Sequence, residues 1–407
     1  MTDVEAVVAR AHAEEWAFVL AATARVAADL DLAEDCVHDA FAQALVRWPV
    51  HGVPRRPGAW LTTVATRRVL EARRREATLR RKLPLLVPEV DGGATDTSPF
   101  PDDRLRLVFT CCHPALSREA QLALTLRLVC GLATPEIARA FLVKETAMQA
   151  RITRAKHKIA EARIPYRVPE AGDLPERVDA VLEVVHLVYT AGHTAAYGHD
   201  LTRSDLAARG LDLARMLHLL MPEEAEATGL LALLELSQAR VPARTDDHGR
   251  LVVMEEQDRN RWDAAATARG LELVRRSLAR APAGRFALMA AAAAVHAEAP
   301  RWEDTDWRQL VGIYDVLLAH WPSPVVALNR AVAVSYVDGP EAALAVLAPL
   351  EQQPGMATYP YLAATRAHLL RRAGDLAGAR DAYEEARLLT GNIVEADFLT
   401  RRITELA

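Results

Sequence analysis

The chain has 407 residues, of which 51% are hydrophobic and 5% aromatic, and its formal net charge is −5. Ala, Leu, Arg and Glu dominate and apolar residues rarely alternate with polar ones, which predicts an all-α protein of two or three domains. The charge is unevenly spread. Residues 1–168 hold about 25 basic and 20 acidic side chains, and residues 169–407 about 24 and 34. A basic half followed by an acidic half indicates nucleic-acid contact in the first.

The sequence also argues against a membrane or secreted protein. Uninterrupted apolar runs stay below the roughly 18 residues of a membrane span, and Glu5 and Arg10 break up the N-terminal stretch that a signal peptide would need. The four cysteines are too few and too irregularly placed for a disulfide framework. We therefore expect a cytoplasmic protein with reduced thiols and no membrane contact. Cys111-Cys112-His113 is interpreted as buried thiols in a helix over Leu105–Leu116, with a metal or redox role as the alternative; we expect no metal and no cofactor.

Helical periodicity runs from Val4 to Trp48. We predict a short connection at Leu30–Leu32 and an end of the second helix at Pro49. The apolar face of this second helix is predicted to hold Val37, Ala40, Phe41, Ala44 and Leu45. Its polar face carries Glu34, Asp35, Asp39 and Gln43.

A third helix is expected after a Pro- and Gly-rich loop at 49–58, with Pro57 in its first turn. Its apolar positions are Trp60, Leu61, Val64 and Leu70, and Trp60 is interpreted as a core residue or a base-stacking one. The helix ends in a dense basic run of Arg67, Arg68, Arg73, Arg74, Arg75, Arg80, Arg81 and Lys82. We place a first domain at 1–83, followed by a linker at 84–103 that is rich in Pro, Gly and acidic residues.

The strongest local pattern lies within a second domain predicted at 104–165. Thr134 and Pro135 are suited to begin a helix, Leu142-Val143 to form a turn, and Lys144 or Glu145 to begin a second helix. Met148, Ile152, Ala155 and Ile159 recur at helical spacing and predict one buried stripe. This is the pattern of a helix-turn-helix whose second helix enters the major groove.

The opposite side of that helix is polar and basic. The residues predicted to face bases are Lys144, Thr146, Gln149, Ala150 and Thr153. Those predicted to contact phosphates are Arg151, Arg154, Lys156 and Lys158. The alternative is an ordinary helix pair with a solvated basic face.

After a linker predicted at 166–175, residues 176–407 are expected to form a helical extension. Residues at about 323–390 resemble tetratricopeptide repeats, because Gly374-Asp375 is followed by Ala379, Tyr383 and Ala386 at helical spacing. Two clusters in this half are candidate sites. His186, His193 and His199 are interpreted as ordinary histidines, with a metal or ligand pocket as the alternative, and Asp258–Asp263 as a structural turn held by ion pairs. No phosphate loop or nucleophile elbow occurs, so an enzyme is not expected.

Three stretches together resemble a known family. Residues 127–159 resemble the region of sigma-70 family factors that reads the −35 element. Residues 32–49 (LAEDCVHDAFAQALVRWP) resemble the helix that binds the polymerase clamp, and 57–75 (PGAWLTTVATRRVLEARRR) the helix that reads the −10 element. Their order and compact spacing resemble extracytoplasmic-function factors. Stretches such as FTCCHPALS (109–117) and SPVVALNRAVAVSYVDGP (323–340) resemble a subgroup with a fused tetratricopeptide-like extension.

The resemblance implies a transcription initiation factor that binds core RNA polymerase and promoter DNA. Polymerase binding would fall to Glu34, Asp35, Asp39, Gln43 and Trp48. The −10 element would be read by Trp60, Thr62, Thr63, Thr66, Arg67, Arg68, Arg73 and Arg74. The extension would regulate activity through an intramolecular contact or a protein partner. Two alternatives remain: a conventional helix-turn-helix regulator with a protein-binding repeat domain, and a scaffold with vestigial DNA contact.

Overall fold

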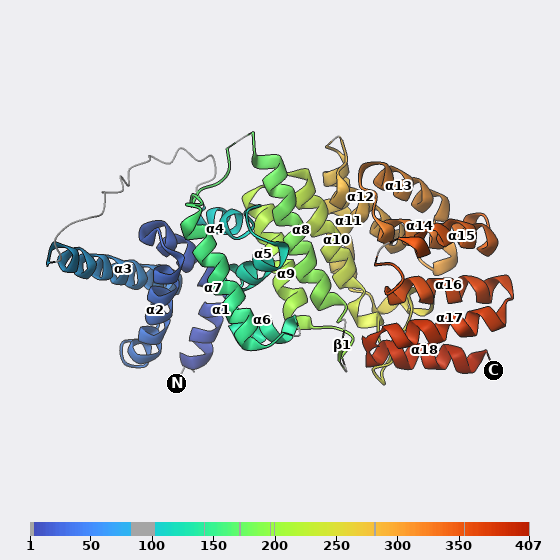
Figure 1. The fold of residues 1–407 in the computed structure, drawn as a ribbon, viewed down its shortest axis with the longest axis horizontal. Helices are drawn as coiled ribbons and strands as arrows, with labels where there is room; N and C mark the ends of the chain where they lie inside the picture. The colour runs from blue at the N-terminus through green and yellow to red at the C-terminus, as the bar shows by residue number, and fades with distance from the viewer. Residues whose placement is uncertain are drawn as a thin grey trace. The chain divides into compact units, whose positions relative to one another are not determined.

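The structure is a computed structural model that describes residues 4–82, 102–141, 143–170, 172–195, 197–198, 200–280, 282–353 and 355–406. The predicted all-α class is confirmed, since these residues form eighteen α-helices and only two strands of two residues each. The strands β1 (Tyr197–Gly198) and β2 (Gly391–Asn392) pair in parallel. The chain separates into two compact units, Met1–Leu187 and Val188–Ala407, and each is considered by itself (Figure 1).

The first unit begins with three helices, α1 (Val4–Ala27), α2 (Leu30–His51) and α3 (Pro57–Lys82), which pack on one another. Their shared core contains Trp16, Leu20, Phe41 and Leu61. The prediction that α3 begins at Pro57 is confirmed. Burial of these apolar side chains is the main force that holds the three helices together.

Two predicted boundaries of α2 are wrong. The connection to α1 lies at Ala28, which has a positive φ of 46°, and Leu30–Leu32 forms the first turn of the helix. Asp29 causes this start because its extended backbone lets the carboxylate accept a hydrogen bond from the Leu32 amide at 2.8 Å. Pro49 lies inside the last turn, where it removes one i→i−4 hydrogen bond shortly before α2 ends at His51.

The rest of the first unit consists of shorter helices. They are α4 (Asp103–Cys111), α5 (Arg118–Leu124), a π-turn at Thr125–Val129, α6 (Thr134–Ala140) and α7 (Glu145–Glu161). The helix predicted over Leu105–Leu116 therefore ends earlier, at Cys111. Helix α8 (Leu174–His193) begins in this unit and ends in the next. Most of the predicted linker at 84–103 lies outside the described residues, and 166–175 lies within the first unit.

Helices α6 and α7 form the predicted helix-turn-helix, and the predicted stripe of Met148, Ile152, Ala155 and Ile159 is buried. Lys144 occupies the N-cap position of α7. Thr134 is the first residue of α6 and does not cap it. Glu136 reaches back instead, and its carboxylate accepts a hydrogen bond from the Ala133 amide at 2.7 Å.

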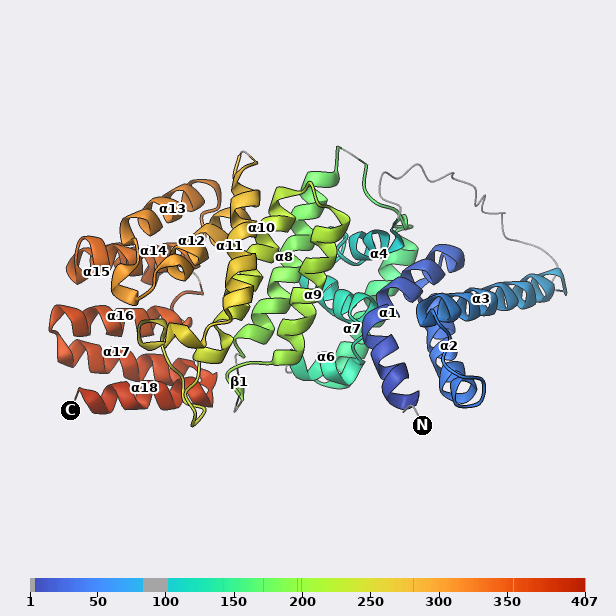
Figure 2. The same cartoon turned by 180° about the vertical axis from the view of Figure 1, so that it is seen from behind.

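The second unit is a succession of antiparallel helices, each packed on its neighbours in sequence. The helices are α9 (Ser204–Leu220), α10 (Ala225–Ala239), α11 (Ala264–Leu278), α12 (Arg285–Glu298), α13 (Trp307–His320), α14 (Pro324–Val337), α15 (Pro340–Leu347), α16 (Pro360–Ala373), α17 (Leu376–Leu389) and α18 (Ile393–Glu405). Short 3-10 turns lie at Val241–Ala243, Met254–Glu256, Arg259–Arg261, Trp302–Asp304 and Ala348–Gln352. Helices α16, α17 and α18 lie side by side in both views (Figure 2).

Close helix packing in this unit depends on small residues. A Cβ added at Gly229 in α10 would lie 2.6 Å from the backbone nitrogen of Ala287 in α12, so these helices touch through their backbones. In the segment predicted to carry the repeats, Gly374 has a φ of 89° and ends α16 in the left-handed region. Ala379, Tyr383 and Ala386 of α17 are then buried against α16. This is the pairing that a tetratricopeptide unit requires, although the assignment to that repeat family stays a prediction.

Candidate nucleic-acid and polymerase interface

Helix α7 separates its apolar residues from its polar ones. Lys144, Thr146, Gln149, Thr153, Arg154 and Lys158, all predicted to contact DNA, are exposed. Ala150, Arg151 and Lys156, from the same prediction, are half-buried. The helix therefore presents a continuous surface of basic and hydrogen-bonding side chains while its other side packs in the core. Such a face can hydrogen-bond base edges and neutralise phosphates.

One member of this face already has a partner within the unit. Gln149 of α7 accepts a hydrogen bond from the hydroxyl of Thr134 at 3.1 Å, which links the two helices of the motif. The contact restricts the amide to a few orientations at the first exposed turns of α7. A side chain held in this way loses less entropy when it binds a base edge.

The residues of α2 that are predicted to bind polymerase differ in their exposure to solvent. Asp35 and Asp39 are exposed, Gln43 is half-buried, and Glu34 and Trp48 are buried at 5% and 2% exposure. When the amide of Gln43 is turned so that its oxygen faces α3, it accepts from Arg68 at 2.9 and 3.1 Å. Only the two aspartates are thus free to meet a partner surface as carboxylates in this conformation.

The residues predicted to read the −10 element line the first turns of α3. Trp60 is half-buried and meets Trp48 edge to face, with ring centroids 5.6 Å apart. Thr62, Thr63 and Thr66 each donate to a backbone carbonyl of the preceding turn, at 2.7 to 2.8 Å. Their hydroxyl oxygens remain able to accept hydrogen bonds, since each uses only its proton.

The arginines that follow differ in their contacts. Arg67, Arg73 and Arg74 are exposed, and Arg68 is half-buried. Arg73 donates to the Ala27 carbonyl at 2.5 Å, which ties α3 to the end of α1. Arg75 lies 4.0 Å from Glu71 on the same helix face. The side chains of Arg80, Arg81 and Lys82 lie outside the described residues.

An ionic cluster joins α2 to the helix-turn-helix half of the unit. The two oxygens of Glu34 ion-pair with different cations, Oε2 with Nζ of Lys156 and Oε1 with a guanidinium nitrogen of Arg127, both at 2.5 Å. Lys156 also lies 2.7 Å from Asp31. Burial by itself would raise the pKa of Glu34. Hydrogen bonding with His38 and the charges of Lys156 and Arg127 outweigh burial and hold this pKa at about 2.

Three further contacts join the same two halves. The indole nitrogen of Trp16 donates to the Leu128 carbonyl at 2.9 Å, Arg25 ion-pairs with Asp103 at 3.0 Å, and the Tyr166 hydroxyl donates to the Ala21 carbonyl at 2.9 Å. Buried and exposed polar contacts therefore hold α1 against the half of the unit that contains the helix-turn-helix. No local pattern in the sequence predicts this arrangement, because every pair joins distant segments.

Sequence reasoning also missed an apolar surface. Leu45 was predicted in the core but is 47% exposed, and Leu70 of α3 is 49% exposed. Val46 and Val50 are exposed by more than 70% on the same end of α2 as Leu45. Leu45 lies outside the narrow buried stripe of α2, because Ala40, Phe41 and Ala44 already occupy that stripe. Exposed apolar residues of this kind mark protein interaction sites.

Burial and electrostatics characterise the other two clusters singled out in the sequence. All four cysteines are buried free thiols, as interpreted, and burial raises the pKa of Cys112 to about 11. Burial, with the charges of Arg244 and Arg240, lowers the pKa of His193 to about 3, whereas His199 lies outside the described residues. Within the described ranges no group of three potential ligands is placed to hold a metal ion, and no helix is both long and apolar enough for a bilayer.

The turn at Asp258–Asp263 is held mainly by caps. Asp258 accepts from the Asn260 amide at 3.0 Å, and Asp263 accepts from the amides of Ala265 and Ala266 at 2.9 Å. An ion pair of 3.6 Å joins Arg261 to Asp247. A turn lies at this cluster as predicted, but helix caps rather than ion pairs are its main contacts.

Comparison with known proteins matches the same parts of the chain. Residues 16–78 match Sigma-70 region 2, residues 106–159 match Sigma-70, region 4, and residues 177–278 match a family of unknown function (DUF6596). An uncharacterized protein of Rhizobium meliloti (strain 1021) is 40% identical over 386 residues, which cover 93% of this chain and 91% of that protein.

The fold and these matches define a transcription initiation factor: a helical unit with one region for core polymerase and one helix-turn-helix for promoter DNA. The chain belongs to the sigma-70 family of RNA polymerase sigma factors. As a member it directs core RNA polymerase to specific promoters. The segment matched by the family of unknown function is compatible with a fused C-terminal extension.

Proposed function

We propose that the protein is a sigma factor of the extracytoplasmic-function type whose C-terminal unit regulates its activity in the cytoplasm. The supporting observation is the exposed polar and basic face of α7 above its buried stripe, in a chain that also carries region 2. Regions 2 and 4, matched at residues 16–78 and 106–159, are separated only by the short segment 79–105. The phosphodiester chemistry belongs to the polymerase, so this chain supplies recognition.

Helix α7 reads the −35 element in this proposal. The exposed side chains near its N-terminus reach base edges, and Gln149, with two donors and an acceptor on its amide, is suited to an adenine edge. Arg151, Arg154 and Lys158 follow at the positions where a helix in the major groove passes the phosphate backbone. The roles assigned to individual residues in the sequence analysis are retained here as proposals.

The start of α3 handles the −10 element. Trp60 offers a ring edge and face beside Trp48, onto which an unpaired base can stack, while Arg67, Arg68, Arg73 and Arg74 supply positive charge for the strand. The polymerase clamp is met by Asp35 and Asp39. We add Leu45, Val46 and Val50 to this surface, because exposed apolar residues beside two carboxylates suit a protein partner.

The contact of Glu34 with Lys156 and Arg127 makes the described conformation a closed one. A phosphate-contacting lysine and a polymerase-contacting carboxylate neutralise each other there and are withheld from DNA and from polymerase. We therefore propose that initiation requires this contact to open. The extension, which is acidic overall, is proposed to bias that opening.

The decisive experiment is run-off transcription with purified core polymerase and genomic fragments, using the full chain. Promoter-specific transcripts are expected only when the chain is added. If core enzyme fails to bind the chain in a pull-down, the proposal is wrong. The alternative of a conventional helix-turn-helix regulator is not favoured, since such a regulator would not carry the polymerase-binding region matched at 16–78.

A further inference from the structure

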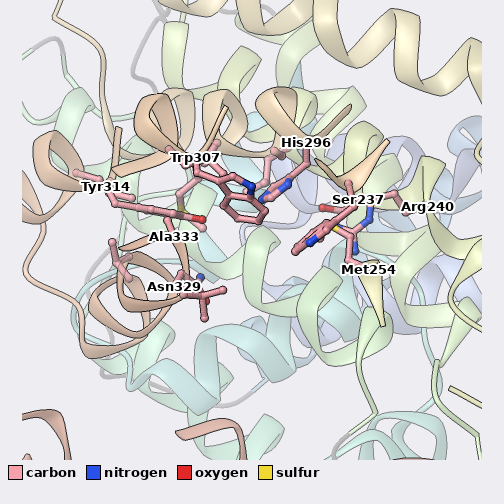
Figure 3. A pocket seen from close by; sticks show the side chains of 17 residues that line it. Ser237, Arg240, Met254, His296, Trp307, Tyr314, Asn329 and Ala333 are labelled. Atoms are coloured by element: carbon pink, nitrogen blue, oxygen red, sulfur yellow. The ribbon is translucent and has the colours of Figure 1, made fainter. Parts of the chain in front are cut away.

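The second unit contains a cavity of about 350 Å³ between its middle helices (Figure 3). Its wall is formed by the end of α10, by α12, α13 and α14, and by the 3-10 turns that carry Met254 and Trp302. Cavities of roughly 300 Å³ and above are the size that proteins use for small molecules. Small side chains on α12 and α14, among them Ala293 and Ala333, leave this space open.

One end of the cavity holds a buried positive charge. Arg240 follows the last residue of α10, and its Nε atom is buried without a hydrogen-bond partner. Arg240 forms no ion pair with a carboxylate in the described part of the chain, and none of the seventeen described lining residues is acidic. Glu235, one turn earlier on α10, is engaged by Arg215 and Arg269 at 2.7 and 3.0 Å.

The charge of Arg240 is only partly balanced by its surroundings. Burial first, and then the nearby charges of Arg244 and Arg259, lower its pKa to about 10, so it stays protonated at neutral pH. The ring of Trp262, 5.5 Å from the guanidinium carbon, and the C-terminal end of α10 offer partial negative charge. Neither supplies the acceptor atoms that a buried guanidinium requires.

The rest of the cavity is lined by aromatic rings. The rings of His296 and Trp302 are nearly parallel, at 8° and 5.8 Å between centroids, and Trp307 stands across Trp302 at 70° and 4.7 Å. Burial, with the charges of Arg240 and Arg259, lowers the pKa of His296 to about 4, so its imidazole is neutral, and its Nδ1 is buried without a partner. A neutral imidazole nitrogen can donate to, or accept from, a bound polar group.

We propose that this cavity is a binding site for a small organic anion: a carboxylate that meets Arg240, carried on a flat apolar body that lies against the rings of Trp302 and Trp307. The carboxylate would supply the missing acceptor for the guanidinium, and His296 would hold a second polar atom of the ligand. The flat body would fill the space over Ala293 and Ala333. This assignment is independent of how the first unit contacts polymerase or DNA.

The test uses the full chain and two probes of the same shape, 2-naphthoate and its neutral amide 2-naphthamide. Isothermal titration calorimetry is expected to show that naphthoate binds at least about tenfold more tightly, because a charge-assisted hydrogen bond is made only with the carboxylate. Arg240→Met should abolish this preference. Arg275→Gln, which alters an exposed arginine on α11, is the matched control and should retain it.

A second variant distinguishes loss of binding from loss of folding. Ala293→Leu narrows the cavity without touching the charge and should weaken both probes, while circular dichroism shows an unchanged helical content. Arg240→Met should not lower the Tm, since it removes a buried charge without an ionic partner. Equal affinity for the two probes, no binding of either, or an undiminished preference in Arg240→Met would each overturn the proposal. No polymerase or DNA is present, so its failure would leave the proposed function unaffected.

Discussion

The ammonium of Lys156 lies 2.5 Å from Oε2 of Glu34, so a side chain of the proposed DNA-reading helix forms an ion pair with one from the proposed polymerase-binding helix. Arg127 approaches the other carboxylate oxygen at the same distance. Because Glu34 is only 5% exposed, its charge depends on these partners. The ion pair thus joins the proposed polymerase-binding surface of α2 to the proposed DNA-binding surface of α7. The first two predictions rest on it.

Arg127→Met is expected to open the closed conformation, because it removes one of the two cations on a buried carboxylate. Arg127 itself is not among the residues proposed to touch DNA or polymerase. Affinity for core polymerase, measured by fluorescence anisotropy without DNA, should rise by up to about tenfold, corresponding to about 1.4 kcal/mol of released contact energy.

Arg154→Met is the matched control, since Arg154 is an exposed arginine of α7. It should leave affinity for core enzyme unchanged in the absence of DNA. Unaltered or weakened binding by Arg127→Met would show that the ion pair does not compete with polymerase.

Acid should weaken the same contact over a defined range. The pKa of Glu34 is held at about 2 against an ordinary 4.5, so its stabilisation is complete above pH 4.5 and is lost as the pH falls toward 2. Between pH 6 and pH 3 the protein should lose ~2 kcal/mol that a Glu34→Gln variant does not lose. Urea unfolding of both proteins at the two pH values measures this difference. Parallel losses in parent and variant would contradict the assigned pKa.

The proposed reader helix predicts two different effects on DNA binding. Gln149→Ala should weaken binding to the cognate −35 duplex by about 1–3 kcal/mol and relax the preference at one base pair. Lys158→Ala should weaken all sequences alike and reduce the slope of log K against log salt by about 1. Anisotropy titrations at several salt concentrations separate the two. The assignment fails if Gln149→Ala lowers affinity for cognate and random duplexes equally.

Substitutions on the buried side of α7 should lower the free energy of unfolding, whereas substitutions on its exposed side should leave it nearly unchanged. Ile152 is 3% exposed, and Ile152→Ala should cost about 2–5 kcal/mol in the free energy of unfolding through lost burial and a cavity. Thr153→Ala, on the exposed side, should stay within about 0.5 kcal/mol. Denaturant unfolding of the two variants checks the contrast. Similar costs would mean that α7 is not oriented as described.

Two helical glycines of the second unit should respond to alanine in opposite directions. At Gly229 the new Cβ would press on the backbone of Ala287, so Gly229→Ala should destabilise by about 1–3 kcal/mol. At Gly312 no atom lies within 4 Å of the added Cβ, and Gly312→Ala should stabilise by about 0.5–1 kcal/mol through helix propensity. Thermal unfolding followed by circular dichroism measures both. A stabilised Gly229→Ala variant would contradict the close approach of α10 and α12.

Local patterns in the sequence determined much of this protein. The spacing of Met148, Ile152, Ala155 and Ile159 was enough to orient α7, because a helix repeats every 3.6 residues whatever it packs against. Pro57 likewise identified the start of α3, since proline lacks only an amide that the first turn does not use. The same motifs carried the family resemblance that the matched regions confirm.

The tertiary structure decided what these helices contact. Glu34 and Lys156 are 122 positions apart, and neither helical period nor composition relates them. Arg240, His296 and Trp302 likewise meet around one cavity although they come from separate turns and helices. The physical reason is the separation in sequence of the interacting residues. Helical turns depend on residues three and four positions apart, whereas ion pairs and cavities depend on which helix faces the folded chain brings together. The sequence alone thus determined which faces of the helices are polar, and packing decided that Lys156 of the proposed DNA-reading helix and Glu34 of the proposed polymerase-binding helix neutralise each other.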